Sequence, residues 1–168
     1  MRLPMLLAVA LLLAAVPFAP WADNDEQRPD TWLRGADDDG ARFERLERYL
    51  GGFSAAMREV GARYERTWEA LQRGNTELAG YHWEKIGDAI RGGYLKRPGR
   101  QANADALFLD TAWPEALEAI GSGDTQRAWR GFAKGRRACL QCHGAEGVEF
   151  MNDQPIFTDL AVPDPGED

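Results

Sequence analysis

Apolar residues recur at alternating steps of three and four along most of the chain, a pattern that predicts amphipathic α-helices. The first such stretch covers residues 41–73. Gly51-Gly52 lies within it and predicts a bend, because glycine weakens a helix interior. Gly74 follows as a C-terminal stop. The apolar positions of this stretch are Phe43, Leu46, Leu50, Phe53, Met57, Val60, Tyr64, Trp68 and Leu71.

Three further stretches predict helices, at 75–95, 103–120 and 124–143. Asn75 and Asp124 precede the second and the fourth helix, where their side chains can cap the first turn. Pro114 splits the third helix or starts a second piece of it. The connections before Asn75 and before Asp124 are short, so consecutive helices should be antiparallel neighbours. The sequence therefore predicts an all-α fold, an up-down-up-down four-helix bundle over 41–147.

The ends of the chain differ from this bundle in composition. Residues 1–22 have a positive start, an apolar run and a proline-rich end, which is typical of a secretory signal peptide. An uncleaved anchor is the alternative, and either form predicts a periplasmic protein. Residues 23–40 read as a flexible acidic leader. Residues 148–168 read as a tail whose apolar first part packs and whose end is disordered.

The charge balance limits the classes of partner. The chain has 20 Lys and Arg against 27 Asp and Glu, a net charge of −7. An acidic surface argues against nucleic-acid binding and suits a basic partner protein. No membrane partner is expected unless the signal peptide is uncleaved.

Both cysteines of the chain lie in one short motif, Cys139-Leu140-Gln141-Cys142-His143. The C-x-x-C-H spacing is that of c-type haem attachment. Residues three apart share one face of a helix, so both sulfurs can reach the vinyl groups of one porphyrin, with His143 as an iron ligand. A disulfide or redox C-x-x-C and half of a zinc site are the alternatives. The motif predicts one covalent haem c on the last helix.

Helix rise identifies the residues expected around this haem. His143 lies about 28 Å below the start of the fourth helix, and Met57 lies about 24 Å below the end of the first. Met57 is therefore a candidate sixth iron ligand. The alternatives are no protein ligand, His82 and Met151. Further expected pocket residues are Phe53 at the same depth, Gly92 and Gly93 as the source of space, and Arg97 and Arg100 as partners of the propionates.

With these features, residues 41–143 resemble the class II c-type cytochromes, the cytochrome c-prime group. The resemblance implies that His143 is the proximal ligand and that Cys139 and Cys142 form thioether links. In that group a methionine of the first helix is the distal ligand in some members, and others have an open distal site that binds small gases. Homodimers are common among them.

The expected function is that of a periplasmic electron carrier which transfers single electrons to a redox partner. The alternative is a haem-based gas-binding or sensor protein with an open or displaceable distal site. An enzyme is not expected. Peroxidase or reductase chemistry requires distal acid-base groups, for which His82 and Glu59 are the candidates. His82 lies only about 10 Å below the start of the second helix, far from the depth of His143, and Glu59 lies off the apolar face.

Overall fold

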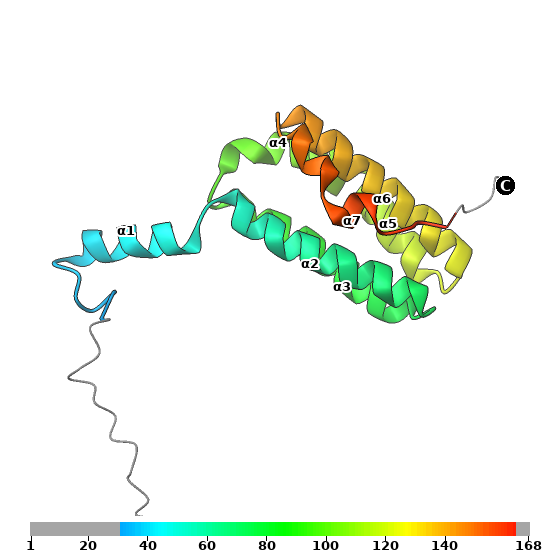
Figure 1. Ribbon diagram of the computed structural model, residues 1–168, viewed down its shortest axis with the longest axis horizontal. Coiled ribbons are helices and arrows are strands. Elements are labelled where there is room, and N and C mark those ends of the chain that lie inside the picture. Colours follow the sequence, from blue (N-terminus) through cyan, green and yellow to red (C-terminus); the bar gives the residue numbers. More distant parts are fainter. Residues whose placement is uncertain (1–30, 164–168) are drawn as a thin grey trace, which may run out of the picture. The chain divides into compact units, whose positions relative to one another are not determined.

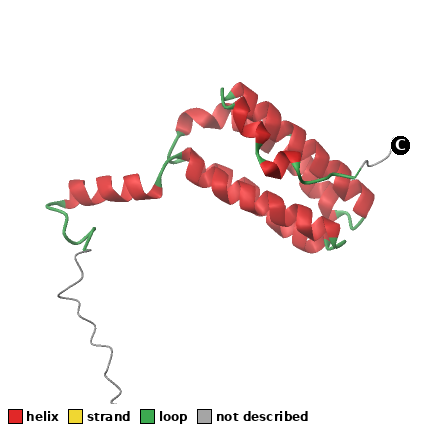
Figure 2. Ribbon diagram, viewed as in Figure 1, coloured by secondary structure: helices red, strands yellow, loops and turns green. Residues whose placement is uncertain are grey.

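The structure is a computed structural model that describes residues 31–163, and within this range it contains helices and no strand (Figures 1 and 2). The predicted all-α class is confirmed. The expected signal peptide at 1–22 and the expected disorder at the end of the tail lie outside the described residues. No helix within 31–163 is long and apolar enough to cross a membrane.

Contacts divide the chain into two units, and the boundary between Arg45 and Leu46 falls within the first helix. In the first unit, residues 31–38 form turns that lead into α1 (Asp39–Leu50). Arg42 Nε donates to the carbonyl oxygen of Leu33 at 3.2 Å, and Arg45 Nη1 donates to that of Trp32 at 2.6 Å. This part of the expected flexible leader therefore has defined contacts with α1.

The predicted first helix is two helices, α1 and α2 (Phe53–Gln72). Gly51 has a φ of +67°, a left-handed conformation that ends α1 instead of bending it. The predicted burial of Phe43 and Leu50 is wrong, because their side chains are 63% and 52% exposed. α1 buries none of its residues, so the apolar pattern of the expected bundle begins at Phe53.

The second unit contains the core. α2 packs along α3 (Thr76–Tyr94), α5 (Ala112–Gly121) packs along α6 (Thr125–Ala145), and α3 contacts α5 (Figure 1). The predicted caps are confirmed: Asn75 accepts from the Leu78 amide and Asp124 from the Arg127 amide, both at 3.0 Å. The largest fully buried side chains are Trp83, Phe132, Leu71, Ile86, Ile120 and Thr67.

The predicted third helix consists of several pieces. A 3₁₀ turn η2 (Pro98–Arg100) leads into α4 (Gln101–Ala104) and the π-helical turn η3 (Asp105–Leu109), and α5 then follows. Pro114 lies in the first turn of α5, where a missing N–H breaks no helical hydrogen bond.

The tail after α6 returns across the second unit as a 3₁₀ helix η4 (Glu149–Asp153) and a short helix α7 (Pro155–Thr158). Trp68 Nε1 donates to the carbonyl oxygen of Ala161 at 2.7 Å, and Arg136 Nη2 donates to that of Leu160, also at 2.7 Å. These two bonds hold the tail against α2 and α6.

Candidate functional site: the carboxyl-terminal end of α6

Cys139, Cys142 and His143 lie in the last turns of α6, which continues past the predicted stop at Gly144 to Ala145. All three side chains are half-buried, and both cysteines are free thiols. The i, i+3 and i+4 spacing places them on one face of the helix. Both cysteines also pack against the core.

Burial raises the pKa of the Cys139 thiol to about 12, and Cys142 adds to the shift. Burial also raises the pKa of Cys142, and Arg100 opposes that rise. Nucleophilic cysteines of dithiol oxidoreductases have the opposite shift, towards a lower pKa. This environment favours neutral thiols over the reactive thiolate that the redox alternative requires.

The His143 ring has a defined partner on one side. Its Nδ1 lies 2.8 Å from Oδ1 of Asn152. Asn152 Nδ2 donates to the carbonyl oxygen of Leu140 at 3.3 Å. That carbonyl can only accept, so the amide NH₂ faces Leu140 and the amide oxygen faces His143. His143 Nδ1 therefore carries the hydrogen, and Nε2 has the lone pair that can bind a metal.

One aromatic ring contacts His143, and two others stack on each other between α2 and α3. Phe157 of α7 meets the His143 ring edge-on, with 5.7 Å between ring centroids. The Tyr94 hydroxyl donates to Oδ1 of Asp105 at 2.6 Å, and burial followed by this carboxylate raises the pKa of Tyr94. Phe53 stacks on Tyr94 with centroids 6.4 Å apart.

The two glycines expected to create space differ from each other. A Cβ on Gly93 would lie 2.8 Å from the Phe53 ring and 3.0 Å from Cβ of Ala56. The space beside Gly93 is thus filled by Phe53, which corrects the expectation that it stays open. Gly92 is exposed, and a Cβ there would meet no atom within 4 Å.

The two arginines expected to meet the propionates already have partners. Arg100 forms an ion pair with the Glu146 carboxylate and also donates to the Glu146 carbonyl oxygen at 3.1 Å. Asn103 Nδ2 donates to the same carboxylate at 2.7 Å. Arg97 is exposed and donates to the carbonyl oxygen of Lys96 at 2.7 Å. Glu146, which the sequence analysis did not single out, is the residue that binds Arg100.

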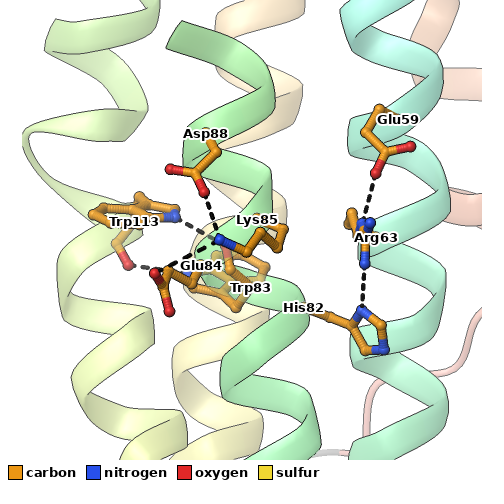
Figure 3. Close-up of polar contacts among 8 residues, drawn as sticks. All are labelled: Glu59, Arg63, His82, Trp83, Glu84, Lys85, Asp88 and Trp113. Atoms are coloured by element: carbon orange, nitrogen blue, oxygen red, sulfur yellow. Dashed lines mark hydrogen bonds and ion pairs between the residues drawn. The ribbon is translucent and has the colours of Figure 1, made fainter. Parts of the chain in front are cut away.

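His82, on α3, contacts Arg63 of α2 (Figure 3). Its Nδ1 lies 3.2 Å from Arg63 Nη1, and Arg63 Nε donates to Glu59 at 2.6 Å. Arginine only donates, so this ring nitrogen of His82 is an acceptor. Burial, followed by Arg63 and Arg66, lowers the pKa of His82. Nδ1 of His82 is thus satisfied by a hydrogen bond from Arg63.

The two methionine candidates lie on different elements. Met57 is half-buried on α2 and packs against the core. Met151 is half-buried in η4, directly before Asn152. Residues 31–163 contain no group of three or more His, Cys, Asp or Glu side chains that could hold a metal ion.

Comparison of the chain with protein-family models, curated proteins and solved structures finds no match.

Proposed function

We propose that this protein is an exported c-type cytochrome that binds one covalent haem on α6 and transfers single electrons. The observation that carries the proposal is the donor set: two free thiols and a histidine with an available Nε2, on one helix face. Each thiol would add S–H across one vinyl group. A C–S bond forms, the vinyl π bond is lost and the hydrogen goes to the other vinyl carbon, so no oxidant is required.

The proposal includes an up-down-up-down bundle of the class II cytochrome type, formed by α2, α3, the α4–α5 segment and α6. The paired arrangement of α2 with α3 and of α5 with α6 supports it. Once bound, the haem supplies the one-electron couple. The chain's residues hold the iron ligand, pack around the ring and exclude water.

A contact between α2 and α6 supports Met57 as the distal ligand. Arg136 Nε donates to the Tyr64 hydroxyl at 2.6 Å, so these two side chains meet between α6 and α2. α2 and α6 run in opposite directions in Figure 1. From Tyr64 to Met57 and from Arg136 to His143 the separation along each helix is the same, about 10 Å. This equal separation supports a position of Met57 near the depth of His143.

The other candidates for the sixth ligand fit less well. Met151 lies in η4 beside Asn152, which contacts Nδ1 of His143, whereas Nε2 is the nitrogen that would hold the iron. His82 contacts Arg63, which lies about 9 Å along α2 from Met57. A thioether ligand would raise the reduction potential relative to a second histidine, which suits an electron carrier.

Mass spectrometry of the exported protein tests covalent attachment. We expect the intact chain to exceed its polypeptide mass by one haem after denaturation and solvent extraction. The double variant C139S/C142S should lose this addition. Haem that extracts from the unchanged protein would contradict the proposal. Rapid binding of CO by the ferrous protein would instead favour the gas-binding alternative.

A further inference from the structure

We infer that Asn152, in the tail after α6, is a positioning residue that orients His143 and lowers the reduction potential of the iron. The inference rests on the proposed haem function. It concerns a residue outside the attachment motif and outside the bundle helices.

Asn152 bridges two parts of the motif. Its amide oxygen lies 2.8 Å from His143 Nδ1, and its amide nitrogen donates to the carbonyl oxygen of Leu140, between the two cysteines. Both ends of one side chain are thus fixed. The imidazole is held against rotation about its Cβ–Cγ bond relative to the backbone that carries the thiols.

The path from His143 to Asn152 is itself constrained. Gly147 has a φ of +69°, and the Val148 amide donates to the carbonyl oxygen of His143 at 2.9 Å, so the chain reverses directly after the motif. Phe157 then packs against the imidazole edge. Two residues of the tail, Asn152 and Phe157, thus contact the imidazole.

The chemical effect follows from the direction of the hydrogen bond. When Nε2 binds a ferric ion, the imidazole loses electron density and its Nδ1–H becomes a stronger donor. An acceptor at Nδ1 therefore stabilises the ferric form more than the ferrous form and raises the basicity of the ligand. A neutral amide should lower the potential moderately, and a carboxylate at the same position should lower it further.

Two variants and one control test this inference on the haem-loaded, exported protein. N152L removes the acceptor, and N152D places a carboxylate there with little change in shape. Q154L is the control, because Gln154 donates to the carbonyl oxygen of Met151 at 2.9 Å in the same tail without contacting His143. The readouts are haem per chain, midpoint potential and the His143 Nδ1–H proton signal of the ferrous protein.

We expect N152L to raise the midpoint potential, N152D to lower it and Q154L to leave it unchanged. We expect shifts of up to about tenfold in the ferric/ferrous equilibrium constant, which corresponds to about 59 mV for one electron. N152L should also accelerate exchange of the Nδ1–H proton.

Three outcomes would overturn the inference. If haem-loaded N152L and N152D both had the midpoint potential of the unchanged protein, the role of Asn152 would be refuted. The proposed haem function would not be affected by that result. Absence of covalent haem from the unchanged protein would refute the proposed function and this inference together. Equal shifts in Q154L and N152L would likewise contradict it, because they would assign the effect to the packing of the tail.

Discussion

Gly135→Ala should destabilise the second unit, because Gly135 is in close contact with the largest buried side chain. A Cβ at this position of α6 would lie 2.5 Å from Cζ2 of Trp83 and closer still to Cη2. Trp83 is fully buried. Its Nε1 donates to the carbonyl oxygen of Trp113 at 3.0 Å, and Trp113 Nε1 donates to the carbonyl oxygen of Trp83, also at 3.0 Å (Figure 3).

The indole of Trp83 cannot move away easily. Phe108 and Phe132 meet it edge-on, with centroids at 5.9 Å and 6.0 Å. Overpacking a core in this way costs about 1–3 kcal/mol, and the rigid ring places the cost near the upper value. Gly→Ala in a helix interior gains up to about 1 kcal/mol. The net loss in free energy of unfolding should therefore be about 2 kcal/mol.

Urea unfolding gives the free energies of unfolding of the Gly135→Ala variant and of a control variant, Gly144→Ala, in the same helix. Gly144 is exposed, and a Cβ there would meet no atom within 4 Å, so its variant should gain up to about 1 kcal/mol. Both proteins are compared with the unchanged chain in the same state of haem loading. Equal stabilities of the two variants would refute the packing of α6 against Trp83 described above.

Two further predictions concern the proposed distal ligand and the Arg63–His82 contact. Met57→Ala should convert a low-spin ferric spectrum into a high-spin one, since it removes the thioether proposed to face Nε2 of His143; an unchanged spectrum would exclude Met57 as the ligand. His82→Gln should reduce the decrease in the free energy of unfolding that occurs between pH 7 and 5. Its folded pKa is lowered by burial and Arg63, so the unfolded chain binds the proton first and stability falls as the pH drops through about 6.5. Urea unfolding across this range measures the slope, and an equal slope in the variant would contradict the assignment.

The sequence alone predicted the starts of the helices that are capped by a side chain next to the first turn. Asn75 and Asp124 cap α3 and α6 through their own side chains, and such signals are visible in a short window. The same pattern was misleading at Phe43 and Leu50. Apolar spacing indicates a helix with an apolar face but does not show that another element covers it, and here both side chains are exposed.

The motif on α6 could be found from its spacing, whereas its environment could not. Asn152 reaches His143 only because the chain reverses at Gly147, and no periodic signal links residues across such a turn. The space beside Gly93 was assigned to the haem because glycine lacks a side chain. It is filled by Phe53 of the neighbouring helix, a contact that depends on how α2 and α3 pack.

The absorption spectrum of the purified, exported protein, oxidised and then reduced, tests the central claim most directly. A c-type spectrum that stays with the chain after denaturation is the predicted result. Sharp low-spin bands on reduction, with a weak red thioether band in the ferric form, would support His143 and Met57 as the axial ligands. A chain without covalent haem would contradict the account, because the arrangement of Cys139, Cys142 and His143 would then serve another chemistry.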